Sequence, residues 1–229
     1  MYNFLRMPSK QRRRAHPAHR FDPIAVSNGL GSRLRLARER KDISVRGLAR
    51  RVGVSPSLVS QIERGHVMPS VGTLYSIANE LQLLLDDLFK DAESGRSPGD
   101  RAKSRGAAPS PVQRHHRRKA ITLAAGVRWE RLTSTPDEKV EFLYVVYDVK
   151  GASCEPDSLI RHGGREYAYM ISGRLGVKIG FEEFALGPGD SISFDAERPH
   201  RLWAIGNEPA VAIWVVLNRH SDGRMRSPA

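Results

Sequence analysis

Residues 44–65 read SVRGLARRVGVSPSLVSQIERG, and their pattern predicts the fold of the first half of the chain. Apolar residues recur at helical spacing on both sides of Gly53, and the second run ends at Gly65. Ser44 and Ser55 stand just before the two runs, where a serine side chain can accept a hydrogen bond from a backbone N–H of the first helical turn. Glycine reaches positive φ without strain, so Gly53 suits the end of a helix. The stretch therefore predicts two short helices joined by a tight turn.

Helical periodicity continues on both sides of this pair. Apolar residues on one face predict a first helix over residues 31–41. Pro69 and Ser70 are typical of a helix start and precede a fourth apolar-periodic run. A short fifth helix is predicted over residues 84–89. The sequence thus predicts an all-α domain of five helices over residues 29–90.

Two helices joined by a glycine-containing turn within a small helical domain are typical of the helix-turn-helix motif. Residues 44–65, followed by MPSVGTLYSIANEL, resemble the lambda-repressor-like, Xre-type family of DNA-binding domains. The resemblance implies that the second helix of the motif lies in the DNA major groove. It also implies a set of DNA-binding residues on and beside that helix: Arg46, Arg50, Ser55, Ser57, Ser60, Gln61 and Arg64.

The chemistry of these side chains divides their expected roles. Gln61 can pair bidentately with adenine, so it is the best candidate for reading a base. The arginines are expected to contact phosphates and to fix the register on the duplex. The family often carries glutamine at the start of both helices of the motif, whereas this chain has Val45 and Pro56 there. Sequence readout is therefore expected to depend on Gln61, on DNA shape or on a basic arm in the minor groove.

Positive charge is concentrated in the first half of the chain. Residues 1–119 hold 24 Lys and Arg against 10 Asp and Glu, whereas residues 120–229 hold 13 against 15. Such an asymmetric field favours a polyanion as partner. The basic half includes a polar arm over residues 1–28 and a linker rich in Ser, Gly, Pro and Arg over residues 91–120, both expected to be flexible.

The single cysteine, Cys154, excludes an internal disulfide and fits a reducing compartment. The sequence contains no apolar run of the length that a transmembrane helix needs. Its first residues are arginine-rich and lack the apolar stretch of a secretory signal. We therefore expect a cytoplasmic protein with no membrane partner.

From residue 121 onward, the pattern changes to short β-type runs separated by Gly, Pro and Asp. Eight such runs are expected to form strands: 127–132, 140–149, 166–171, 175–179, 181–186, 191–194, 199–204 and 211–216. Many short strands with regularly spaced turn signals are typical of a sandwich or barrel. The second half thus predicts an all-β barrel over residues 121–217, followed by a tail over residues 218–229.

Two histidines and a glutamate in these runs resemble the motifs of the cupin family, whose fold is a double-stranded β-helix barrel. His162, Glu166 and Gly173 have the spacing of the first cupin motif, and His200 stands at the histidine position of the second. Ile160 occupies the place of the family's first metal histidine. The resemblance implies that the remaining side chains point into the barrel as a 2-His-1-carboxylate group.

Two interpretations of this group stay open. His162, Glu166 and His200 provide three ligands for a divalent metal, although the loss of one imidazole weakens such a site. Alternatively, the same side chains hydrogen-bond an organic ligand in a mostly apolar pocket. Strand alternation and the cupin resemblance give the expected pocket residues: Ile160, His162, Glu166, Met170, His200 and Leu202.

A helix-turn-helix domain joined to a cupin barrel resembles a group of prokaryotic transcription regulators. The resemblance implies a sequence-specific DNA-binding protein, not an enzyme, whose cupin domain forms a homodimer and senses a small-molecule effector. Its expected partners are a double-stranded DNA operator and that effector, and a divalent metal is the one cofactor to consider. Two alternatives remain: a metal-dependent cupin dioxygenase or isomerase tethered to a DNA-binding module, and an architectural DNA binder whose barrel only dimerises.

Overall fold

A computed structural model describes residues 29–89 and 110–219 of the chain. The predicted arm over residues 1–28, and most of the predicted linker and tail, therefore lie outside the described residues. The described end of the linker contains the short 3-10 helix η1 (His115–Arg117) and leads directly into the first strand. Within the described ranges, no helix has the length and apolar character that crossing a membrane requires.

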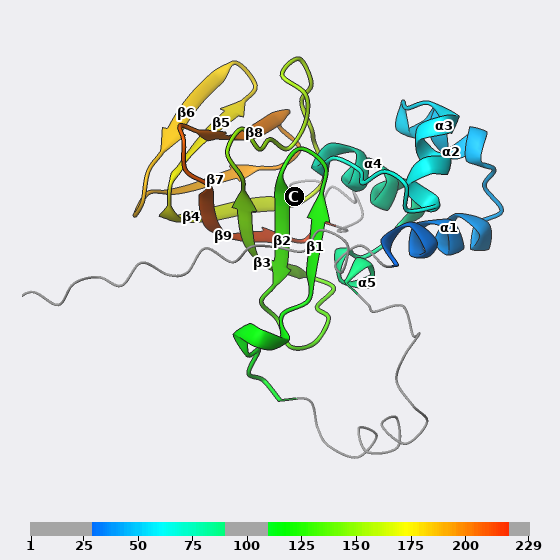
Figure 1. Cartoon of the computed structure of the whole chain (residues 1–229), viewed down its shortest axis with the longest axis horizontal. Coiled ribbons are helices and arrows are strands. Elements are labelled where there is room, and N and C mark those ends of the chain that lie inside the picture. Colours follow the sequence, from blue (N-terminus) through cyan, green and yellow to red (C-terminus); the bar gives the residue numbers. More distant parts are fainter. Residues whose placement is uncertain (1–28, 90–109, 220–229) are drawn as a thin grey trace, which may run out of the picture.

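The N-terminal domain consists of helices connected by short turns (Figure 1). The elements are α1 (Leu30–Arg40), α2 (Val45–Val52), α3 (Pro56–Glu63), α4 (Val71–Leu81) and α5 (Leu85–Leu88). The first four confirm the predicted helices. The predicted count of five helices is wrong, because the short helix predicted over residues 84–89 is a single turn of four residues, α5, which already buries Leu85 and Leu88 in the core. The described domain thus has four helices of eight residues or more.

Capping side chains set the boundaries of the helix-turn-helix motif as the sequence predicts. The hydroxyl of Ser44 accepts a hydrogen bond from the backbone N–H of Gly47 (3.0 Å), and that of Ser55 accepts one from Leu58 (3.1 Å). Gly53 ends α2 with φ at 77°, where a side chain would be strained. Local interactions therefore fix the turn between α2 and α3.

A close approach between α1 and α3 holds the second helix of the motif in place. Gly31 lies so close to α3 that an added Cβ atom would be 2.2 Å from the carbonyl oxygen of Ile62. Arg38 donates two hydrogen bonds, of 2.6 and 2.8 Å, to the carboxylate of Glu63. Both charged side chains are buried and have lost their hydration, and each supplies the hydrogen-bond partner that the other would otherwise lack. The orientation of α3 therefore depends on α1.

The C-terminal domain is built from antiparallel strands. They are β1 (Ala120–Leu123), β2 (Val127–Arg131), β3 (Val140–Tyr147), β4 (Arg165–Ser172), β5 (Arg174–Ile179), β6 (Glu182–Leu186), β7 (Ser191–Asp195), β8 (His200–Ile205) and β9 (Ala210–Leu217). Strands β2 to β9 confirm the eight predicted runs. Strand β1 was not predicted and extends the sheet by pairing with β2.

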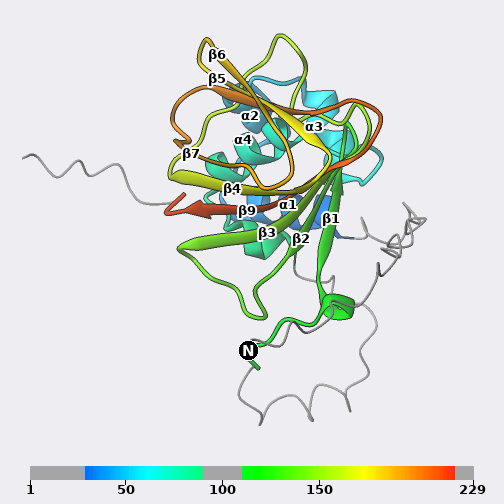
Figure 2. The same cartoon turned by 90° about the vertical axis from the view of Figure 1, so that its left-hand side faces the viewer.

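The strands form two sheets, with the orders β1-β2-β3-β9-β4-β7 and β6-β5-β8 (Figure 2). The expected closed barrel is not shown. Among the described strands, no ladder joins the two sheets, and only single bridges, Ile160 to His200 and Ala152 to Trp203, connect loops to β8. Each of these bridges is isolated, so they do not extend into a ladder between the sheets.

Helix α4 packs against the strands, so that the two domains are docked on each other (Figure 1). The backbone N–H of Gly72 donates to the carbonyl of Ser153 (3.1 Å), and that of Ala124 donates to the carbonyl of Pro69 (2.9 Å). Buried apolar side chains of both domains form one continuous cluster. The sequence predicted a flexible linker between the domains, and this contact was not predicted.

Candidate functional site

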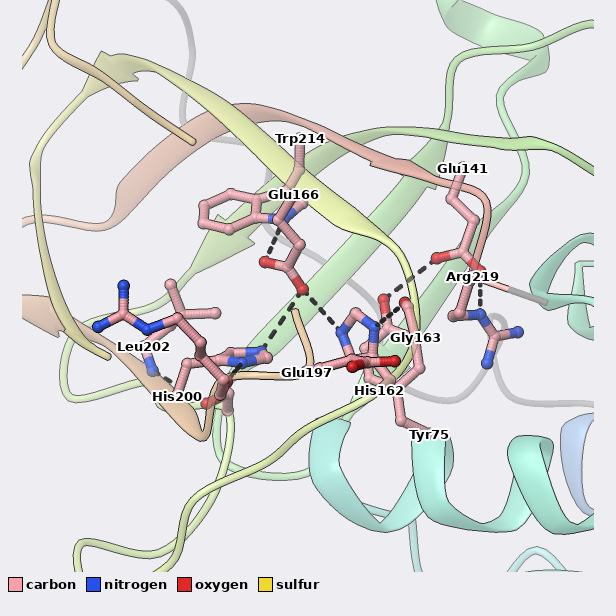
Figure 3. Close-up of polar contacts among 12 residues, drawn as sticks. Tyr75, Glu141, His162, Gly163, Glu166, Glu197, His200, Leu202, Trp214 and Arg219 are labelled. Carbon is pink, nitrogen blue, oxygen red and sulfur yellow. Dashed lines mark hydrogen bonds and ion pairs between the residues drawn. The ribbon is translucent and has the colours of Figure 1, made fainter. Parts of the chain in front are cut away.

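A buried polar cluster lies between the two sheets (Figure 3). Glu166 on β4, His162 in the preceding loop and His200 at the start of β8 are each at most 4% exposed. Nε2 of His162 lies 2.7 Å from Oε1 of Glu166, and Nε2 of His200 lies 3.5 Å from the same atom. The structure thus brings together the three candidate ligands that the sequence indicates.

Backbone carbonyls determine which nitrogen carries the hydrogen in each of the two imidazole rings. Nδ1 of His162 lies 3.0 Å from the carbonyl oxygen of Gly163, and Nδ1 of His200 lies 2.8 Å from that of Arg198. Because a carbonyl oxygen only accepts, each Nδ1 carries a hydrogen. In a neutral ring, the Nε2 lone pair points at the carboxylate, and within the described ranges neither Nε2 then has a hydrogen-bond donor. A second proton on Nε2 would make the ring a donor to Oε1 of Glu166. A positive charge beside Glu166 would stabilise the cluster. Either a second proton on one of the imidazole rings or a bound cation would supply that charge.

The second oxygen of Glu166 is held from the other side of the site. The indole Nε1 of Trp214 on β9 donates to Oε2 at 2.9 Å. Burial acts to raise the pKa of Glu166, but hydrogen bonding from His162 and His200 and their positive charges outweigh it and lower this pKa to about 2. Burial acts to lower the pKa of His162, and the contact with Glu166 outweighs it and raises this pKa. Glu166 is thus ionised at neutral pH and attracts a cation.

Strand alternation brings the carboxylate inside. On β4, the side chains of Glu166, Ala168 and Met170 are buried, whereas those of Tyr167 and Tyr169 between them are exposed. Successive side chains of a strand point to opposite faces of the sheet, and the prediction of the pocket residues relied on this alternation. The prediction that β4 directs Glu166 into the interior therefore agrees with the structure.

A cavity of about 20 Å³ adjoins the cluster, which is room for roughly one water molecule. Of the predicted pocket residues, Ile160, Glu166 and Leu202 line it, whereas His162, Met170 and His200 are buried without forming part of its wall. The remaining wall consists of apolar and aromatic side chains of the strands, together with Val71 and Tyr75 of α4. The cavity is therefore shared between the two domains.

Tyr75 reaches this site although the sequence analysis gave α4 no part in it. Its ring stacks on His162 with a centroid distance of 4.3 Å and an interplanar angle of 29°. Its hydroxyl donates to Oε2 of Glu141 at 3.2 Å, and Glu141 also pairs with Arg219. One sequence signal was present, because Val71 and Tyr75 are four residues apart and form a second apolar stripe on the helix.

The predicted DNA-binding residues lie on α2, α3 and the adjoining turns, on the side of the domain away from the strands (Figure 1). Exposed side chains are those of Arg46, Arg50, Ser55, Ser57 and Arg64, and half-buried ones are those of Ser60 and Gln61. The hydroxyl of Ser55 caps α3, and Nε2 of Gln61 lies 3.5 Å from the hydroxyl of Ser57. Docking on the C-terminal domain thus leaves this surface open to solvent.

Comparison with known proteins assigns a family to each domain. The family profile described as "Helix-turn-helix" matches residues 34–88, and the profile described as "Cupin domain" matches residues 143–216. Over 58 residues, the chain is 34% identical to YazB of Bacillus subtilis (strain 168), described as an uncharacterized HTH-type transcriptional regulator. The matched segment is 84% of that protein and 25% of this chain. The chain belongs to the helix-turn-helix transcriptional regulators.

Other relatives of this regulator carry similar names. It is 46% identical over 66 residues to SlrR, an HTH-type transcriptional regulator of the same organism, and spans 43% of that protein. It is 37% identical over 70 residues to an uncharacterized transcriptional regulator in the ATPase CF(0) region of Rhodospirillum rubrum, and spans 65% of it. These segments are 28% and 31% of the regulator itself.

A solved structure shares the overall fold. The crystal structure of an HTH_3 family transcriptional regulator from Vibrio cholerae matches 86% of this regulator and 98% of its own chain. The TM-score is 0.57 and the sequence identity is 21%. The match extends over most of the chain, so the likeness in fold includes residues of both domains.

Proposed function

We propose that this regulator binds a specific DNA operator as a homodimer and that its cupin domain senses a small-molecule effector. The buried cluster of His162, Glu166 and His200 carries the proposal. Ionisable side chains in an apolar interior destabilise a protein unless they are fully paired or bind a ligand that pairs with them. The cluster adjoins a cavity that α4 of the DNA-binding domain helps to line. A ligand bound there would therefore act directly on the DNA-binding domain.

Helix α3 supplies the proposed base contacts. Ser57 and Gln61 lie one turn apart on its surface, and Gln61 can pair bidentately with adenine. The exposed side chains of Arg46, Arg50 and Arg64 are proposed to bind phosphates on both sides of the groove. Together these contacts would hold α3 in the major groove.

An exposed apolar surface on the six-stranded sheet is the proposed dimer interface. On β4, Tyr167, Tyr169 and Ile171 are between 39% and 53% exposed, and Phe142 on β3 is 37% exposed. Large apolar side chains gathered on one exposed face are typical of a protein interface. The proposed occupant is a second copy of this chain, because half-sites about 34 Å apart on DNA require two linked DNA-binding domains.

The same cluster suits a divalent metal ion. Its three ligand atoms lie within 4.8 Å of one another, and the carbonyl contacts at Nδ1 leave both Nε2 atoms available for coordination. A metal held by His162, Glu166 and His200 would supply a Lewis-acidic centre with open positions. In a sensor, such a centre would bind an oxygen atom of the effector. This donor set also favours a second candidate function, a metal-dependent cupin enzyme tethered to a DNA-binding module.

Selection of bound sequences from a random duplex pool at near-physiological salt tests the proposed regulator. The expected result is a palindrome with half-sites about one helical turn apart. Binding without any enriched motif, lost as the salt concentration rises, would contradict sequence-specific regulation. Metal analysis of the purified protein, combined with turnover assays, separates the two candidates, because turnover that requires a stoichiometric metal would favour the enzyme.

A further inference from the structure

Tyr75 belongs to the DNA-binding domain, but its ring lies in the interior of the cupin domain (Figure 3). The ring stacks on His162 at 4.3 Å between centroids and packs against Trp129 at 5.4 Å, tilted by 50°. Its neighbours on α4, Leu74 and Ile77, are at most 1% exposed in the core of the helical domain. One helix therefore has a face buried in each domain, and Tyr75 is the aromatic side chain on the face toward the cupin domain.

A buried ion pair holds both the ring and the hydroxyl of Tyr75. The hydroxyl donates to Oε2 of Glu141, whose carboxylate pairs with Arg219. The guanidinium of Arg219 lies 5.2 Å from the ring centroid of Tyr75. It also donates to Oδ1 of Asn79 (2.9 Å) and to the carbonyl of Leu83 (3.0 Å), so that it joins the sheet to the end of α4. The position of the ring and the docking of the two domains thus depend on the same contacts.

The space beside the ring is too small for an organic molecule. The cavity of about 20 Å³ has room for roughly one water. Helix α4 cannot come closer, because a Cβ atom added to Gly72 would lie 2.4 Å from Cγ2 of Ile160. A solvent-open groove of about 320 Å³, lined by Arg161, His162, Gly163 and Glu197, reaches the neighbourhood of His162 from outside. A molecule that enters from this groove and stacks on the face of the His162 ring that Tyr75 covers must therefore displace the ring of Tyr75.

We infer that Tyr75 occupies the place of the effector, and that a small phenol or related hydroxyaromatic molecule displaces its ring and thereby undocks the DNA-binding domain from the cupin domain. The inference rests on the proposed function of the cupin domain as an effector sensor. The displaced ring defines the class of ligand. The site offers the imidazole of His162 and the indole of Trp129 to a flat aromatic face, and the carboxylate of Glu141 to a hydroxyl donor.

The test uses 4-methylphenol, which reproduces the side chain of tyrosine. Spin labels are placed on the exposed positions Arg40→Cys in α1 and Asn207→Cys between β8 and β9 of the full chain. The natural thiol is removed by Cys154→Ser, and dilution with unlabelled protein suppresses distances between chains. Pulsed electron–electron resonance then gives the distribution of distances between the two domains, while calorimetric titration gives the affinity for 4-methylphenol.

The expected distance distribution is narrow in the unliganded wild type and broad in two cases: wild type saturated with 4-methylphenol, and Tyr75→Ala without it. Tyr75→Phe keeps the ring and is expected to retain the narrow distribution. A tethered ring competes at an effective concentration in the millimolar range, so its removal in Tyr75→Ala is expected to tighten 4-methylphenol binding at least about tenfold. The matched control is Tyr144→Ala, which removes a half-buried tyrosine beside Arg118 and is expected to change neither measurement.

A narrow distribution in wild type saturated with 4-methylphenol overturns the inference, and so does equal affinity of wild type and Tyr75→Ala. The wild-type measurement needs no substitution at Tyr75, so it decides the question even if Tyr75→Ala does not fold. The proposed function is tested separately by operator selection. If the protein selects an operator but 4-methylphenol does not change the distance between the domains, only the inference is contradicted. If the protein selects no operator, the proposed function is contradicted.

Discussion

Replacement of Arg38 by methionine would leave a buried carboxylate without its partner at the end of α3. The side chain of Glu63 is 6% exposed, and Arg38 donates to both of its oxygens at 2.6 and 2.8 Å. Removing one member of a buried ion pair costs about 3–5 kcal/mol. Arg38 also donates to the carbonyl of Ile43, and the loss of that hydrogen bond adds about 1 kcal/mol. Because domains are stable by only about 5–15 kcal/mol, Arg38→Met is expected to bring the protein close to unfolding.

Urea unfolding followed by circular dichroism measures this loss. The double variant Arg38→Met/Glu63→Met is expected to recover most of it, because a well-packed apolar pair often replaces a buried ion pair without cost. The matched control is Arg35→Met, which breaks an ion pair of 2.8 Å with Glu39 on the exposed face of the same helix and should change stability little. Equal stability of Arg38→Met and Arg35→Met would refute the reasoning, as would a double variant less stable than Arg38→Met.

Four further predictions concern DNA, metal and assembly. Gln61→Ala is expected to weaken operator binding by about 1–3 kcal/mol and to relax one base position; an equal loss on all sequences would contradict a base contact. Arg50→Ala is expected to weaken binding to every sequence and to lower the salt slope by about one, and an unchanged slope in salt titrations would exclude a phosphate contact. Addition of Zn²⁺ or Mn²⁺ to metal-free protein is expected to raise the melting temperature in wild type and in the exposed control Glu182→Gln, but not in Glu166→Gln; the same rise in all three would mean that the ion binds elsewhere. Tyr169→Asp is expected to convert the dimer to a monomer in analytical ultracentrifugation, and a variant that stays dimeric would exclude this face of the sheet.

Features of short range made much of the fold predictable. Ser44, Gly53 and Ser55 act on backbone groups within a few residues, so the boundaries of the helix-turn-helix motif followed from the sequence. Alternation along β4 placed Glu166 inside, and the cupin spacing indicated His200 as its neighbour. These signals depend on local geometry, which a sequence pattern records directly.

The contact between the domains could not be predicted in the same way. Tyr75 and Glu141 are 66 residues apart, and Arg219 joins Asn79 from a distance of 140 residues. The stripe of Val71 and Tyr75 indicates a second buried face of α4, but no local pattern shows which surface covers it. The short extent of α5 was not predictable from helical periodicity either, since a single turn already buries Leu85 and Leu88.

The two buried faces of α4 also have a consequence for the exchange of domains between such proteins. Transfer of this helix-turn-helix domain to a different sensor would expose Val71 and Tyr75 to water, and transfer of this cupin domain to a different DNA reader would leave its interior without the ring that fills it. A functional hybrid would need compensating changes on both sides of the junction. The pair of domains, rather than either domain alone, is thus the module that recombination can exchange.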